Sequence, residues 1–74
     1  MRPGLPVVSG AQVVRALQRA GFVEAGRRGS HVKLHGSGGR TVIVPLHDEL
    51  ARGTLGSILR QAGVTAEELA VLLG

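Results

Sequence analysis

The sequence contains no cysteine, tryptophan or tyrosine, and Phe22 is its single aromatic residue. Without cysteine, the chain can form neither a disulfide framework nor a thiolate metal site. With one aromatic residue, it lacks the stacking side chains that many single-strand nucleic-acid binders use. Residues 1–8 also lack the long apolar core of a signal peptide or a membrane span. These absences predict a cytoplasmic protein that does not contact a membrane.

A chain of 74 residues has room for one small domain, and a domain of this size buries too little surface to enclose a deep pocket. We expect residues 1–8 to form an extended N-terminal tail and residues 9–74 to form the domain. The binding site should then be a shallow face or groove, which suits a polymer better than a small metabolite. No small-molecule cofactor is expected.

Positive charge dominates, because nine Lys and Arg residues against five Asp and Glu residues give a formal net charge of +4. All of these cations except Lys33 are arginine, whose planar guanidinium binds phosphate oxygens two at a time. This composition favours a phosphate-rich partner such as a nucleic acid. A solvated basic surface would have the same composition, so charge alone leaves both interpretations open.

A first helix is predicted over residues 10–20. Ser9 and Gln12 have the spacing of a capping box, in which each residue bonds to the other's backbone amide at the helix start. Gly21 can adopt the left-handed conformation that ends a helix. The side chains expected on the buried face recur at helical spacing: Val13, Val14, Leu17 and Ala20.

Alternating residues predict three strands, over residues 22–27, 31–35 and 40–44, joined by turns at 28–30 and 36–39. The two core-facing residues of the second strand are Val32 and Leu34. Its opposite face carries three polar side chains, His31, Lys33 and His35. If the glycine-rich turn holds three residues, Val32 and Leu34 pair with Val44 and Val42, and Pro45 lies opposite His31.

The second half of the chain predicts a loop over residues 46–52 and two helices. Thr54 is expected to cap a helix that ends at Gly63, and Thr65 with Glu68 has the capping-box spacing for a short final helix. The order is then helix, three-stranded antiparallel meander, helix and short C-terminal helix. It predicts an α+β fold of the double-stranded-RNA-binding-domain-like type, with helices on one sheet face and the other face open.

The sequence has no paired carboxylates at metal-ligand spacing, and the adjacent Asp48 and Glu49 are typical of solvent-facing loop charges. We therefore expect no metal site. Cleavage of RNA does not require one, because the 2′-hydroxyl can attack the neighbouring phosphorus once a base removes its proton. One histidine at a phosphate-binding surface would be sufficient for this reaction.

His31 is the best candidate for that base, because imidazole titrates near neutral pH and can accept a proton in one step and donate one in another. Arg27 and Arg28 precede it across the Gly29–Ser30 turn, and Lys33 projects from the same strand face. These cations would stabilise the charge of a phosphate in the reaction. The alternative is an exposed strand histidine without a chemical role.

The other two histidines are weaker candidates. His35 shares the face of His31 but lies about 13 Å from it along the strand, too far to act on the same phosphate. His47 follows Pro45 by two residues, so the expected register would bring it near His31. The alternative for His47 is a loop histidine that caps the following turn.

Four short motifs stand out along the chain: Gly29-Ser30-His31, Pro45-Leu46-His47, Gly53-Thr54-Leu55 and the segment from Ile58 to Gly63. Together they resemble the signature series of the HicA family of small messenger-RNA interferase toxins. Their order and separations are similar to those of the family, and the resemblance extends over about residues 9–68. Ile43 and Leu46 depart from the family pattern, which more often has a polar and a basic residue at these positions.

The resemblance implies the toxin of a toxin–antitoxin pair, an endoribonuclease that cleaves messenger RNA and is neutralised by a HicB-type antitoxin. It implies that His31 is the catalytic residue, that Gly29 and Ser30 form the turn presenting it, and that His47 is a signature position with a possible accessory role. The residues that we expect to bind RNA are Arg27, Arg28, Gly29, Lys33 and Arg40.

Two other functions fit the same topology. A non-catalytic double-stranded-RNA binder would carry lysines at the start of the second helix, but the sequence there has no positive side chain between Gly53 and Arg60. A protein-interaction module without activity, such as a decayed toxin, would not need His31. The presence of this histidine therefore counts against the second alternative.

Overall fold

The computed structural model describes residues 5–74. In chain order, its elements are α1 (Gly10–Arg19), β1 (Val23–Arg28), β2 (His31–His35), the 3-10 turn η1 (Ser37–Gly39), β3 (Thr41–Pro45), α2 (Arg52–Ala62) and α3 (Ala66–Leu73). The strands pair antiparallel in the order β1-β2-β3. The predicted α+β fold is confirmed. Residues 1–4, the first half of the expected tail, lie outside the described residues.

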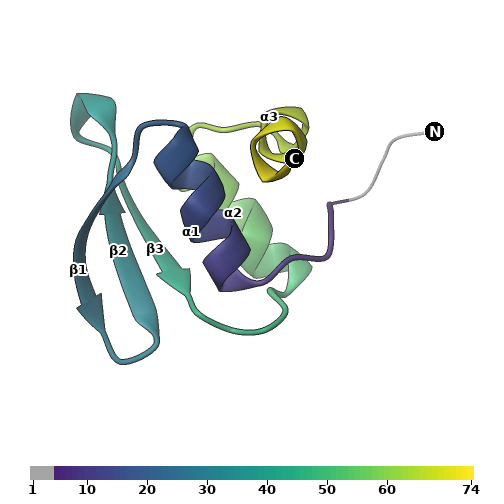
Figure 1. Cartoon of the computed structure of the whole chain (residues 1–74), viewed down its shortest axis with the longest axis horizontal. Coiled ribbons are helices and arrows are strands. Elements are labelled where there is room, and N and C mark those ends of the chain that lie inside the picture. Colours follow the sequence, from purple (N-terminus) through teal and green to yellow (C-terminus); the bar gives the residue numbers. More distant parts are fainter. Residues whose placement is uncertain (1–4) are drawn as a thin grey trace.

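The helices and the sheet form separate layers (Figure 1). α1 and α2 lie against the same face of the sheet, and α3 packs against α1 on the side away from the strands. Among residues 5–74, no helix covers the opposite face of the sheet, as the alternation in β2 predicted. No helix in this part of the chain has the length and apolar character needed to cross a membrane.

The core lies between the sheet and the helices. Its fully buried strand residues are Val32, Leu34, Val42 and Val44. Burial of a side chain of this kind stabilises the fold by about 1.5–3 kcal/mol. The predicted register is confirmed, because Val32 pairs with Val44 and Pro45 lies opposite His31. The open face of β2 therefore carries the polar side chains that the alternation placed there.

The start of α1 was predicted correctly, and the helix ends one residue earlier than predicted, at Arg19. Ser9 and Gln12 form the reciprocal capping box, and Gly21 follows the helix with a positive φ of 102°. The predicted buried face is wrong at one position, because Ala20 is exposed and Ala16 is buried in its place. Ala20 is the C-cap residue, so it lies beyond the last helical turn that contacts the core.

β1 and β3 each lie one residue later than predicted. Phe22, expected to begin the first strand, is instead buried, and its ring occupies the space where Gly36 would otherwise have a side chain. Arg28, expected in the turn, belongs to β1 and pairs with His31. The turn therefore consists of Gly29–Ser30 alone. This two-residue turn brings Arg28 directly beside His31 in the sheet.

The predicted start of α2 is wrong. The helix begins at Arg52 with Ala51 as its N-cap, so Thr54 lies inside the first turn. Alanine has no side-chain oxygen, and the sequence therefore gives no capping signal at this position. Leu50 is buried and its amide donates a 2.8 Å hydrogen bond to the carbonyl of Val8, which is also buried. Packing of this segment, rather than a side-chain cap, fixes where α2 begins.

The end of α2 and the start of α3 follow the sequence signals. Gly63 ends α2 with a left-handed φ of 68°, and Thr65 with Glu68 forms the predicted capping box. A hydrogen bond from the Thr65 amide, with a smaller contribution from its side chain, lowers the pKa of Glu68. Arg19 donates a hydrogen bond to the Leu72 carbonyl and so connects α1 to the last turn of α3.

Backbone contacts join the end of β3 to the start of α1. The Gly10 amide donates a 2.9 Å hydrogen bond to the His47 carbonyl, and a Cβ at Gly10 would collide with the Pro45 carbonyl oxygen. The Leu46 amide donates to the Ser30 carbonyl at 2.6 Å. We call this set of contacts the β3–α1 junction. It connects the helical layer to the turn that precedes His31.

The close contact at Gly10 predicts that Gly10→Ala lowers the free energy of unfolding by about 1–3 kcal/mol, because the added methyl group must displace backbone. Gly53→Ala is the matched control, since a Cβ at Gly53 meets nothing within 4 Å. The control should be as stable as the wild type or up to about 1 kcal/mol more stable. Urea unfolding of the three proteins measures the difference, and wild-type stability of Gly10→Ala would contradict the close contact.

Candidate functional site

The strand register arranges the open-face residues in rows that cross the sheet. The two rows nearest the β1–β2 turn are Arg28, His31 and Pro45, followed by Gly26, Lys33 and Ile43. Pro45, at the β3 end of the first row, is buried. Adjacent rows lie about 7 Å apart, because they are separated by two residues along each strand. Arg28 therefore flanks His31 across the sheet, while Lys33 flanks it along β2.

His31 is the first residue of β2, and it is exposed. The preceding Gly29 adopts a φ of 57°, a conformation that glycine reaches more readily than other residues. Ser30 is held from the other side by the hydrogen bond from the Leu46 amide. The turn and the β3–α1 junction thus fix the backbone next to His31, and its imidazole faces solvent from a defined position.

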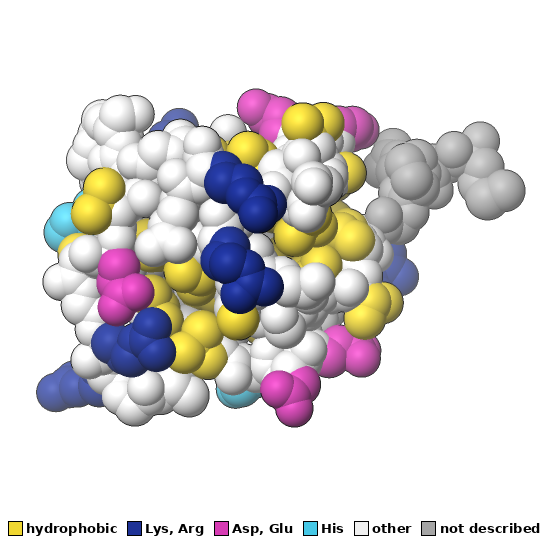
Figure 2. Space-filling model, in the orientation of Figure 1, with side chains coloured by type: hydrophobic (Ala, Val, Ile, Leu, Met, Phe, Trp, Pro, Cys, Tyr) yellow, Lys and Arg dark blue, Asp and Glu magenta, His cyan; other side chains and the backbone are white. Residues whose placement is uncertain are grey.

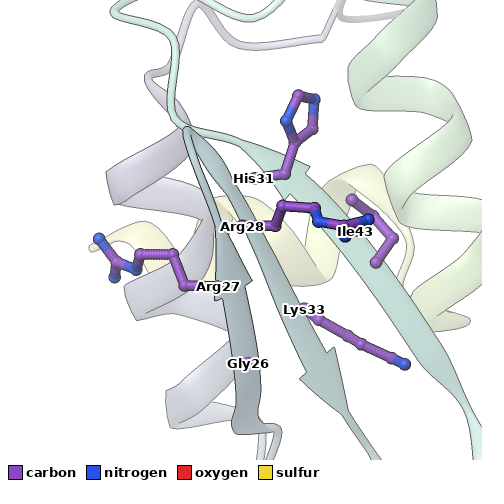
Figure 3. Close-up of a pocket in the computed structure, with 6 residues that line it drawn as sticks. All are labelled: Gly26, Arg27, Arg28, His31, Lys33 and Ile43. Carbon is purple, nitrogen blue, oxygen red and sulfur yellow. The ribbon is translucent and has the colours of Figure 1, made fainter.

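A shallow hollow lies on the open face beside this histidine (Figure 3). The residues that line it are Gly26, Arg27, Arg28, His31, Lys33 and Ile43. We call it the open-face hollow. Figure 3 shows Arg28, Lys33 and Ile43 extending to the same side, whereas Arg27 extends away from them. The Arg27 guanidinium lies 3.4 Å from the Glu24 carboxylate.

Arg40, which was expected to join the RNA-binding group, lies elsewhere. Its guanidinium donates a 3.3 Å hydrogen bond to the Gln61 carbonyl and occupies the space next to Gly63. This is the C-terminal end of α2, where a cation is favoured by the helix dipole and the unpaired carbonyls. The structure therefore does not bring Arg40 together with His31, and its part in RNA binding stays a prediction.

The other two histidines, His35 and His47, are exposed, and neither lines the open-face hollow. His35 ends β2, two rows from His31, and pairs with Thr41. His47 follows β3, and its carbonyl accepts the hydrogen bond from Gly10. Its backbone is thus part of the β3–α1 junction, two residues beyond the proline that lies opposite His31.

Gly26 and Ile43 line the hollow but were not predicted as RNA-binding or catalytic residues. Neither residue has a charged, titratable or nucleophilic side chain, so neither is selected as a site residue from sequence. The available signal for Gly26 was a glycine inside a strand pattern, which often marks a bulge or the close approach of a ligand. The structure has a register shift between Glu24 and Gly26, so this part of β1 does contain a bulge.

Charge is not confined to the open face. Figure 2 shows Lys and Arg side chains over α1, and Asp and Glu side chains gathered over α3. The open-face hollow differs from these surfaces because its cations adjoin a histidine, and the described residues that line it include no acid. Within residues 5–74, no group of three or more His, Cys, Asp or Glu side chains is placed to hold a metal ion.

The fold and the hollow together define a small basic α+β domain whose open sheet face suits a phosphate-rich polymer. A family model described as "HicA toxin of bacterial toxin-antitoxin" matches residues 10–64. The match covers most of the chain and includes the whole sheet with its open-face hollow. The chain belongs to this family, and its role is that of a toxin in a toxin–antitoxin system. No curated protein matches the chain.

The exposure of the open face predicts that His31→Ala and Lys33→Ala change the free energy of unfolding by less than about 0.5 kcal/mol. Leu34→Ala on the same strand is the contrasting variant, because its buried side chain should cost about 2–5 kcal/mol when removed. Urea unfolding measures all three. A loss above about 2 kcal/mol for His31→Ala would show that this side chain supports the fold.

Proposed function

We propose that this toxin is an endoribonuclease that cleaves messenger RNA without a metal ion, with His31 as its catalytic residue. The observation that carries the proposal is the placement of an exposed histidine beside Arg28 and Lys33 in a hollow whose described lining residues include no acid. A phosphate bound by these cations would place an RNA backbone next to the imidazole. Membership of the HicA toxin family supports the same function.

In the proposed reaction, the neutral imidazole of His31 accepts the proton of a 2′-hydroxyl, and the 2′-oxygen forms a bond to the adjacent phosphorus. The bond from this phosphorus to the 5′-oxygen of the next nucleotide breaks, and the imidazolium returns the proton to that oxygen. The products are one RNA that ends in a 2′,3′-cyclic phosphate and one that begins with a 5′-hydroxyl. Atoms and charge balance without a cofactor.

The cations have two roles in this proposal. Arg28 and Lys33 stabilise the negative charge that develops on the reacting phosphate, because they flank His31 in two directions. Arg27 and Arg40 extend elsewhere and would bind phosphates farther along the strand. Such contacts contribute affinity but no chemistry.

Ser30 and His47 are proposed as accessory residues. Ser30 immediately precedes His31, and its carbonyl is bonded to the Leu46 amide, so it positions the catalytic backbone. His47 is exposed and belongs to the same junction. An RNA strand that crosses the sheet along the row of His31 and continues past β3 would reach His47.

We also propose that the antitoxin is of the HicB type and covers the open sheet face. A shallow site is blocked only by a partner that occupies it directly. Ile43 is 42 % exposed beside Lys33 and offers such a partner an apolar contact. An acidic surface on the antitoxin would complement Arg28 and Lys33.

The catalytic assignment predicts that His31→Ala reduces the rate of RNA cleavage by at least about 100-fold, because it removes the proton-transfer group. Purified wild type and variant are compared on a defined messenger RNA in EDTA. Wild-type activity should survive the chelator. A folded His31→Ala protein that cleaves at the wild-type rate would contradict the assignment, and wild-type RNA binding without cleavage would favour a non-catalytic module.

The geometry of the cations predicts different salt dependences of RNA binding. Arg28→Ala should flatten the slope of log affinity against log salt by about 0.7, the value for one phosphate contact on a single strand. Arg15→Ala is the control, because it removes the same charge from an exposed position on α1, in the helical layer, and should change the slope less. Equal slopes for the two variants would contradict the assigned contact of Arg28.

A further inference from the structure

Gly26 is a glycine that the fold does not require. It lies inside β1, does not have a positive φ, and a Cβ added to it would meet nothing within 4 Å. Gly10 and Gly36, by contrast, are each closely packed against other atoms. A glycine within a strand is less stable than alanine by roughly 0.5–1 kcal/mol. Neither backbone conformation nor packing therefore accounts for glycine at this position.

The missing side chain instead shapes the open-face hollow. Gly26 pairs with Lys33, which in turn pairs with Ile43. This row of the sheet therefore has no side chain on β1, a cation on β2 and an exposed apolar side chain on β3. Figure 3 shows Arg28 extending across β2 in the direction of Ile43. The hollow thus has an apolar side chain at Ile43, the cations Arg28 and Lys33 on the side to which they extend, and an open position at Gly26 on β1.

These surfaces suit one component of RNA, an unpaired nucleobase. A base has a flat face that packs on apolar groups and stacks on a guanidinium plane, while its own phosphates carry the charge that Arg28 and Lys33 complement. A base within a duplex is already stacked and paired, so it does not offer this face. The hollow lies beside His31, which places such a base next to the phosphate that reacts.

We infer that the open-face hollow binds an unpaired base adjacent to the cleaved phosphate, and that Gly26 is the residue that leaves room for it. The inference rests on the proposed ribonuclease function. Gly26 is a specificity-determining position here, since it has no group that takes part in the reaction. Any side chain larger than hydrogen would project into the space that the base occupies.

The test compares Gly26→Val with wild type on two oligoribonucleotides that share one mapped cleavage site. The first is unmodified, and the second has an abasic nucleotide beside the cleaved phosphate. On the unmodified strand, kcat/KM of Gly26→Val should fall about 10-fold, the size expected for loss of one stacked base. On the abasic strand, wild type should be slower by a similar factor, and valine should cause little further loss because both changes remove the same contact.

Ala25→Val is the matched control, because it places a valine side chain at the neighbouring residue of β1. It should retain wild-type kcat/KM on both strands. Thermal unfolding should show that Gly26→Val is at least as stable as wild type, since valine is favoured in strands and the position is open. A loss of activity from misfolding would instead lower the unfolding temperature.

Wild-type kcat/KM for Gly26→Val on the unmodified strand would overturn the inference and leave the ribonuclease function standing. The inference would also be overturned if Gly26→Val weakened antitoxin binding but left cleavage unchanged. It would be overturned as well if valine reduced cleavage of the abasic strand as much as cleavage of the unmodified strand. Absence of any His31-dependent cleavage by the wild type would overturn both proposals together.

Discussion

Two backbone hydrogen bonds at the end of β3 hold the site in place. The Leu46 amide bonds to the Ser30 carbonyl, and the Gly10 amide bonds to the His47 carbonyl. Each bond joins segments that are distant in sequence, so together they fix the β1–β2 turn relative to the helical layer. β2 begins with His31, immediately after that turn. In a domain too small to surround a site with core, backbone contacts of this kind define where an exposed catalytic group would lie.

Local signals predicted most of the fold, because they describe interactions between residues close in sequence. The capping boxes at Ser9 and Thr65 are each completed within three residues. Alternation in β2 separated the core face from the open face, and the glycine-rich turn then determined the register that places Pro45 opposite His31. His31 and Lys33 could therefore be placed on the open face from the sequence, and the motif resemblance made this histidine the catalytic candidate, a role that stays a proposal.

Features that depend on distant contacts were not predicted. α2 begins at Arg52 because the preceding segment is packed into the core, so the threonine expected to cap it lies inside the helix. Arg40 turns to the end of α2, a position that its place beside the glycine-rich turn does not indicate. Gly26 carries no chemical signal, and its part in the hollow follows only from its pairing with Lys33.

The most direct test of the proposed mechanism concerns the nucleophile. An oligoribonucleotide with a known cleavage site is prepared with a single 2′-deoxynucleotide on the 5′ side of the cleaved phosphate and is incubated with the wild-type toxin in EDTA. If His31 acts by removing the proton of the 2′-hydroxyl, cleavage at that phosphate is lost while other sites are still cut. Cleavage of the modified linkage at the unmodified rate would contradict the mechanism, because water or a protein group would then be the nucleophile.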